Sequence, residues 1–344
     1  MFTLLKKQAQ NLFPGYFALI MATGALSISS FLLKMVFISK LFLAVNIAAF
    51  IVLWFLTLIR LFFYFPDFCK DLISHKLGPS FFTLIAGTAM FGSQLIIIGG
   101  HHRIAVWLWV LAIFLWIVIM YTFFTAVTIR KNKPAIAQGI NGAWLIAAVA
   151  TQSISILGTL LSPHLVSGRT IVLFSTLCMY FLGCMLYLNI ITLIFYRFTF
   201  VDLKYAALSP PYWINMGAVA ITTLAGSMLI LHAKYWPMLQ EITPFLKGFT
   251  LFFWITGTWW IPLLFILMLW RYFYHHYPLS YDPQIWGMVF PLSMYVAGTF
   301  QLSKALQLPF LLIIPKIMFY IALATWMLAF FGMLHHIYQK TANK

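Results

Sequence analysis

The chain has 344 residues, of which 63% are hydrophobic and 8% are charged, and its mean hydropathy is +0.98. A soluble domain carries roughly 25% charged residues. A globule of this length could not hide so much apolar surface from water. These values exclude a soluble enzyme, a secreted disulfide scaffold and a disordered chain, and they indicate an integral membrane protein.

Apolar segments of the sequence predict ten transmembrane helices, because a helix needs about 20 apolar residues to cross a bilayer. The loops between them are short, so we expect a single transmembrane domain over residues 1–344. The expected spans lie near 14–33, 39–63, 79–99, 104–128, 139–161, 170–196, 210–231, 245–269, 284–303 and 309–337.

The net charge of +16 comes from 21 Lys and Arg against 5 Asp and Glu. These cations are scattered singly, which favours anchoring of helix ends to lipid headgroups over binding of nucleic acid. Thirteen of them fall at the ends of the spans that share a side with the N-terminus, and seven fall at the opposite ends. The positive-inside rule therefore predicts a multi-pass protein of the inner cell membrane with both termini in the cytoplasm.

Odd-numbered and even-numbered spans differ in composition. Of 19 glycines, 14 lie in or beside the odd spans, which open with a helix breaker followed by aromatic residues, as in Pro14-Gly15-Tyr16-Phe17. The even spans carry bulky stretches such as Leu53-Trp54-Phe55-Leu56. This alternation predicts an inner ring of five helices inside an outer ring of five, built from five helical hairpins with an internal repeat of roughly 65 residues.

Small and hydroxyl residues recur at helical spacing along the odd spans. Such a face either lets helices pack closely or lines a narrow pathway. Taken as a pathway, the candidate lining residues are Thr23, Gly24, Thr88, Gly92, Thr151, Ser155, Gly217, Thr222, Gly226, Ser293 and Ala297.

The predicted membrane interior is poor in charge. All five acidic residues fall in loops or at helix ends, and the odd spans contain no Lys or Arg before Lys304. An uncharged polar lining suits a weakly hydrated anion. We therefore expect no buried cation in the pathway, with Lys304 as the nearest candidate. Motifs for metal binding or catalysis are absent from the sequence, so we expect neither an enzyme nor a metal or cofactor.

Phe290-Pro291 is the most distinctive local feature of the ninth span. Proline within a helix removes a backbone hydrogen bond and bends the helix. Phe290 lies beside that bend, with Ser293 and Ala297 following on its face. From composition alone, an ordinary core phenylalanine is the alternative, because the chain has 35 of them.

Several segments together resemble the tellurite-resistance/dicarboxylate transporter family, within the voltage-dependent anion channel superfamily. This family includes bacterial tellurite-resistance channels, fungal malate permeases and plant slow anion channels. The resemblance runs from about residue 12 to residue 330. The segments that carry it are Pro14-Gly15-Tyr16-Phe17 with Met21-Ala22-Thr23-Gly24, Asn141-Gly142-Ala143-Trp144, Trp213-Ile214-Asn215-Met216-Gly217-Ala218, Gly257-Thr258-Trp259-Trp260-Ile261-Pro262 and Trp286-Gly287-Met288-Val289-Phe290-Pro291.

The resemblance implies an all-α membrane fold of ten helices, arranged as five hairpins around a central pore with quasi-fivefold symmetry. It also implies a homotrimer with one pore per subunit, and a gate on the ninth helix at Phe290 and Pro291. The expected function is transport of small anions, nominally C4-dicarboxylates such as malate, through a pore gated by an aromatic side chain. A channel for chloride or nitrate, or one of the tellurite-resistance type, is the alternative. A non-transporting membrane scaffold or sensor is a more remote one.

Overall fold

The computed structural model describes residues 6, 8–165 and 167–342. These residues contain ten helical spans that are long and apolar enough to cross a membrane. The five odd-numbered spans contain α2 (Phe17–Leu32), α5 (Phe82–Gly99), α8 (Ile146–Leu161), α10 (Ile214–Leu231) and α13 (Trp286–Leu306). The five even-numbered spans contain α3 (Val36–Phe63), α6 (His102–Ile129), α9 (Arg169–Phe200), α12 (Thr243–Leu269) and α14 (Ile313–Ala342).

Each odd-numbered span begins with a short 3₁₀ turn before its α-helix. The turns are Pro14–Tyr16, Gly78–Phe81, Gly142–Leu145, Pro210–Trp213 and Pro283–Ile285. Proline suits the first turn of a helix because its missing N–H would have no intrahelical partner there. In the third turn, which lacks proline, the Asn141 side chain accepts a hydrogen bond from the Ala143 backbone N–H at 2.9 Å. The helix breakers in the sequence therefore mark the starts of the spans.

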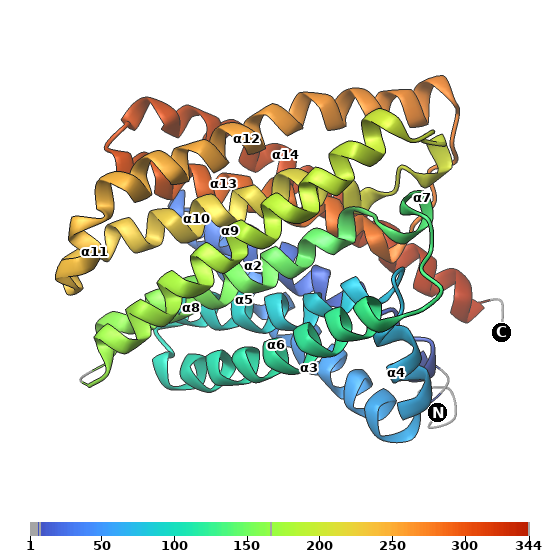
Figure 1. The fold of residues 1–344 in the computed structure, drawn as a ribbon, viewed down its shortest axis with the longest axis horizontal. Coiled ribbons are helices and arrows are strands. Elements are labelled where there is room, and N and C mark those ends of the chain that lie inside the picture. The colour runs from blue at the N-terminus through green and yellow to red at the C-terminus, as the bar shows by residue number, and fades with distance from the viewer. Residues whose placement is uncertain (1–5, 7, 166, 343–344) are drawn as a thin grey trace.

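The odd-numbered helices form a closed inner ring. Each contacts two others, in the order α2, α5, α8, α10, α13 and back to α2. Each outer helix packs against the inner helix that precedes it in the chain and also touches the next one around the ring. Both ends of the described chain lie at the same end of the bundle as α4 (Phe65–Leu72) and α7 (Ile136–Gly139), whereas α11 (Pro237–Glu241) lies at the opposite end (Figure 1). The predicted all-α fold of five hairpins in two rings is confirmed.

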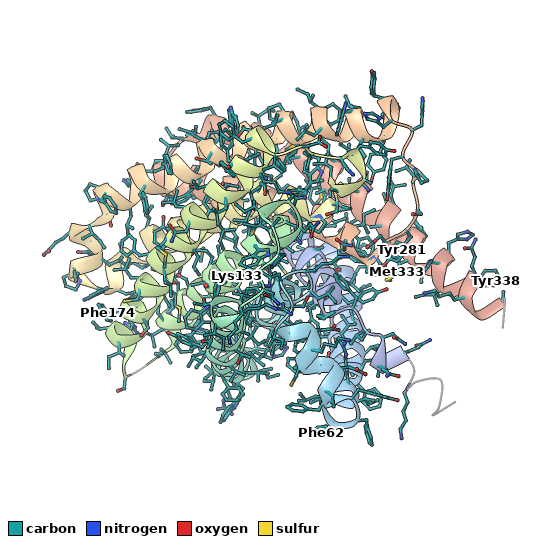
Figure 2. All side chains as sticks on the ribbon, turned by 45° about the vertical axis from the view of Figure 1, so that its right-hand side comes forward. Phe62, Lys133, Phe174, Tyr281, Met333 and Tyr338 are labelled. Carbon is teal, nitrogen blue, oxygen red and sulfur yellow. The ribbon has the colours of Figure 1, made fainter. Side chains whose placement is uncertain are left out.

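Burial separates the two rings as their compositions predict. In the inner spans, 78–94% of the residues in the apolar stretch are buried, against 22–39% in the outer spans. Figure 2 shows Phe62 and Phe174 projecting outward from α3 and α9, and their side chains are exposed. Large apolar side chains on an outer surface are stable when lipid covers them, so the outer ring presents the membrane-facing surface.

The observed spans differ from the predicted ones by a few residues at their ends. The eighth extends beyond position 269 through a π-helical turn, Trp270–Tyr274, and the sixth continues to Phe200 rather than ending at 196. These extra turns carry Arg271 and Arg197, whose side chains are buried. The two predicted spans end just before these cations and therefore miss this part of each helix.

Candidate functional site: a vestibule at the start of the inner helices

A cavity of about 350 Å³ opens where the five inner spans begin, and we call it the vestibule. Its lining includes residues from the opening of every inner span, together with residues of the connecting segments such as Leu77 and Gln138. Ligand pockets generally measure about 300–1,000 Å³, so the volume suits a small molecule or ion. The fivefold arrangement of the inner ring thus produces one shared cavity on its axis.

The vestibule lining repeats at intervals of three residues along the inner spans. The outermost layer consists of Gly15, Ser80, Ala143, Pro211 and Gln284. The middle layer consists of Ala18, Thr83, Ile146, Ile214 and Gly287. The innermost layer consists of Met21, Val149 and Phe290. One face of each inner helix therefore points toward the axis near its beginning.

Phe290 is the largest side chain of the innermost layer and is 1% exposed. The corresponding positions on α5 and α10, three residues beyond Thr83 and Ile214, are the small residues Ala86 and Gly217. The ring of Pro291 packs closely against Gly217, where an added Cβ would lie 2.6 Å from the proline Cγ. Pro291 also leaves the carbonyl of Gly287 without its intrahelical donor. Of the predicted gate residues, Phe290 thus lies at the inner end of the vestibule, and Pro291 packs against α10 beside it.

Three of the hydroxyl residues predicted to line a pathway face outer helices instead. The indole Nε1 of Trp326 donates to Thr23 Oγ1 at 3.0 Å, and that of Trp116 donates to Thr151 Oγ1 at 2.8 Å. Ser155 Oγ donates to the backbone carbonyl of Thr176 on α9 at 2.7 Å. These hydroxyls hold the two rings together, and the structure places them at inner–outer helix contacts rather than on the vestibule wall.

Replacing Thr151 with valine removes the acceptor of the Trp116 indole and leaves a buried donor without a partner. We expect the variant to lose about 0.5–1.5 kcal/mol of stability while its preference among anions stays that of the wild type. Thermal denaturation in detergent and anion flux in proteoliposomes measure the two quantities. Thr199→Val, at an exposed threonine that bonds only to its own helix, is the control. A changed anion preference in Thr151→Val would restore Thr151 to the pathway.

The four glycines predicted to line a pathway lie at close contacts between helices. An added Cβ would lie 2.8 Å from Met90 Cγ at Gly24, and 2.7 Å from a methyl carbon of Leu157 at Gly92. Gly217 faces Pro291, and Gly226 faces Thr250 and Tyr180 on the outer helices α12 and α9. The sequence allowed either close helix packing or a pathway lining for these glycines, and all four lie where helices pack closely.

The remaining candidates are Thr88, Thr222, Ser293 and Ala297, which are fully or almost fully buried. The hydroxyls of Thr88, Thr222 and Ser293 each donate to the carbonyl four residues earlier in their own helix. None of the four lines the vestibule. Their place on a pathway deeper in the ring stays a prediction.

Two cations line the vestibule, Lys76 and Arg197, and no Asp or Glu does. Arg197 is 7% exposed, which corrects the expectation that no buried cation would be available. Lys304, the candidate named from the sequence, is exposed, and its Nζ lies over the Phe300 ring. The helix N-termini around the vestibule add partial positive charge. The cavity is therefore electrostatically suited to an anion.

The rim near the vestibule gains little charge from histidine at neutral pH. The pKa of His75, which precedes Lys76, is lowered by partial burial and then by the nearby cations Arg130 and Lys133. Its neutral form is thus favoured, and the positive charge comes from Lys and Arg. Among the residues that the structure describes, no group of three or more His, Cys, Asp or Glu could hold a metal ion.

Comparisons with known proteins agree with this architecture. Residues 11–334 match the family described as voltage-dependent anion channel. The chain is similar to an uncharacterized transporter of Methanocaldococcus jannaschii, with 29% identity over 353 residues that cover 97% of this chain and 94% of the relative. It is also similar to an uncharacterized membrane protein of Mycobacterium tuberculosis, with 38% identity over 152 residues that cover 44% of this chain and 77% of the relative.

Proposed function

The chain belongs to the voltage-dependent anion channel family, and from this premise we propose that it transports malate-like C4-dicarboxylates along the axis of the inner ring. The observation that carries the proposal is the vestibule, where all five inner spans converge on a cavity lined by two cations and no carboxylate. Positive walls raise the local concentration of anions and steer them inward. Dicarboxylates are attracted more strongly than monovalent anions because they carry twice the charge.

Phe290 is the proposed gate of this pathway. Its ring occupies the innermost layer of the vestibule, together with Met21 and Val149. Proline at position 291 weakens the helix at this level because one backbone hydrogen bond is missing. Rotation of the phenylalanine side chain away from the axis would join the vestibule to the interior of the ring.

A channel for chloride or nitrate, or for oxyanions of the tellurite type, is the second candidate. The observation in its favour is that α2, α5, α8 and α10 contain no charged residue. A divalent anion that leaves the vestibule would meet no compensating charge along these helices. A weakly hydrated monovalent anion needs less compensating positive charge.

Uptake of labelled malate into proteoliposomes tests the proposal and separates the two candidates. If malate is the substrate, uptake is saturable and succinate competes better than chloride or nitrate at equal concentration. If the second candidate holds, chloride and nitrate pass and malate does not compete. The absence of flux for every anion would leave the non-transporting scaffold or sensor as the remaining explanation.

We further propose that both termini face the cytoplasm, that the protein resides in the inner membrane and that it assembles as a homotrimer. The charge bias and the placement of both ends of the described chain at one end of the bundle support the orientation (Figure 1). Labelling of single cysteines near the vestibule in intact cells and in inverted vesicles checks the orientation. Mass measurement of the detergent-solubilised protein checks the trimer.

A further inference from the structure

Three hairpins place a buried arginine at the same position, near the end of the outer helix. Arg60 at the end of α3, Arg197 at the end of α9 and Arg271 just beyond α12 are 4%, 7% and 6% exposed. A buried guanidinium stays charged and needs partners that offset its lost hydration. The partners of these three arginines therefore show what each site is built to hold.

Arg60 and Arg197 make the same contact with the inner helix of their own hairpin. Nη1 of Arg60 donates to the carbonyl of Leu12, two residues before the opening at Pro14, at 2.8 Å. Nη1 of Arg197 donates to the carbonyl of Ile140, two residues before the opening at Gly142. The internal repeat thus relates the two arginines, and this contact fixes each guanidinium beside the start of an inner span.

The two arginines differ in the anion that faces them. Nη2 of Arg60 donates to a carboxylate oxygen of Asp71, which forms the one salt bridge found in the described part of the chain. Arg197 has no such acid, and its other hydrogen bond runs from Nη1 to the Tyr212 hydroxyl. Nε is buried without a hydrogen-bond partner in all three arginines, so Arg60 and Arg197 differ at Nη2, which in Arg197 makes no hydrogen bond with any described residue.

A guanidinium nitrogen such as Nη2 donates a charge-assisted hydrogen bond to a carboxylate oxygen. At Arg60 the Nη2 donor already binds a carboxylate of the protein. Arg197 is the member of the set that lines the vestibule, and Arg271 lines a separate, smaller cavity with Leu208 and Trp213. Arg197 is thus the buried cation placed where an anion enters.

From this comparison we infer that Arg197 is the specificity residue of the vestibule and binds a carboxylate group of the transported anion, as Arg60 binds Asp71. The inference rests on the proposed function, because it assigns a binding residue to that same pathway. Lys76, exposed on the vestibule lining, supplies a second positive charge. The site therefore favours small dicarboxylates over chloride, because a dicarboxylate has one carboxylate for Arg197 and a second negative charge for Lys76, whereas chloride carries a single charge.

The test compares Arg197→Gln, Arg197→Lys and Arg271→Gln in the full-length protein reconstituted in proteoliposomes. Initial rates of malate uptake and of chloride flux are measured against concentration. In Arg197→Gln we expect the half-saturating malate concentration to rise about tenfold or more, as loss of a hydrogen bond to a charged group predicts, while chloride flux changes little. Arg197→Lys keeps the charge without the planar guanidinium, so its half-saturating malate concentration should fall between those of the wild type and Arg197→Gln.

Arg271→Gln is the matched control, since it removes an equally buried arginine from the same place in its hairpin without touching the vestibule. It should lower stability and leave the ratio of malate to chloride transport unchanged. If Arg197→Gln and Arg271→Gln lose flux equally for both anions, Arg197 is only a structural residue and the inference is wrong.

Calorimetric titration of malate into the detergent-solubilised protein separates this inference from the proposed function. Malate binding that disappears in Arg197→Gln and persists in Arg271→Gln upholds the site even if no anion is transported. Malate transport with an unchanged half-saturating concentration in Arg197→Gln overturns the site and leaves the proposed function intact. Absence of malate binding to the wild type, together with absence of flux, contradicts both.

Discussion

Replacement of Phe290 with alanine should raise the anion conductance of the protein about tenfold or more, which corresponds to removal of about 1.4 kcal/mol from the barrier. The ring of Phe290 is the largest group in the innermost layer of the vestibule, whose other members are Met21 and Val149. Planar-bilayer recordings of the purified wild type and variant, at equal protein content, measure the change.

The control for this prediction is Phe253→Ala. Phe253 is as buried as Phe290, but it lies on the outer helix α12 and does not line the vestibule. Truncation of a buried phenylalanine costs about 3–5 kcal/mol at either site, so both variants lose stability and only Phe290→Ala should gain conductance. Equal conductance in the wild type and in Phe290→Ala would return Phe290 to the role of a core residue.

Gly142→Val should strongly destabilise the fold where the third inner span begins. An added Cβ at Gly142 would overlap the backbone carbonyl of Pro211 and lie 2.7 Å from the Cα of Tyr212. Neither neighbour is a flexible side chain, so the openings of α8 and α10 would have to separate. We expect a loss of about 3 kcal/mol, seen as a lower thermal unfolding midpoint and poor recovery of folded protein in size-exclusion chromatography.

Gly248→Ala is the matched substitution for that experiment. Gly248 lies on the outer helix α12, and no atom lies within 4 Å of the position that its Cβ would take. Alanine in a helix is more stable than glycine by about 0.5–1 kcal/mol, so this variant should melt at the same temperature as the wild type or slightly higher. A Gly142→Val protein that is as stable as the wild type would show that the two openings are not in close contact.

The fold could be predicted from the sequence because its signals are local. Breakers such as Pro14 and Pro79 start the inner spans. Bulky outer spans and glycine-rich inner spans give the two rings their different burial. These features depend on composition and on position along one helix, and they do not require knowledge of how the helices are turned relative to the axis.

The lining of the site could not be predicted in the same way. Thr23 and Thr151 have the spacing that an axial face would have, but the same spacing serves a face that bonds to Trp326 and Trp116 on the outer helices. Rotation of a helix about its own axis decides between these faces, and periodicity alone does not fix it. Most of the vestibule lining comes instead from the openings and first turns of the inner spans.

Arg197 was missed for a related reason. In the sequence it stands at the end of an apolar segment, where a cation normally anchors the helix to lipid headgroups. In the structure α9 continues past it to Phe200, and the side chain turns inward to Ile140 and Tyr212. The recurrence of arginine at the ends of three outer helices, at Arg60, Arg197 and Arg271, was the signal in the sequence that could have identified it.

The most direct test of anion transport along the ring axis is the reversal potential of Phe290→Ala under a gradient of potassium malate across a planar bilayer. We expect a reversal potential close to the equilibrium potential of the anion, and a return toward zero when the gradient is removed. A reversal potential close to that of potassium would show that the pathway carries cations and would contradict anion transport along the axis.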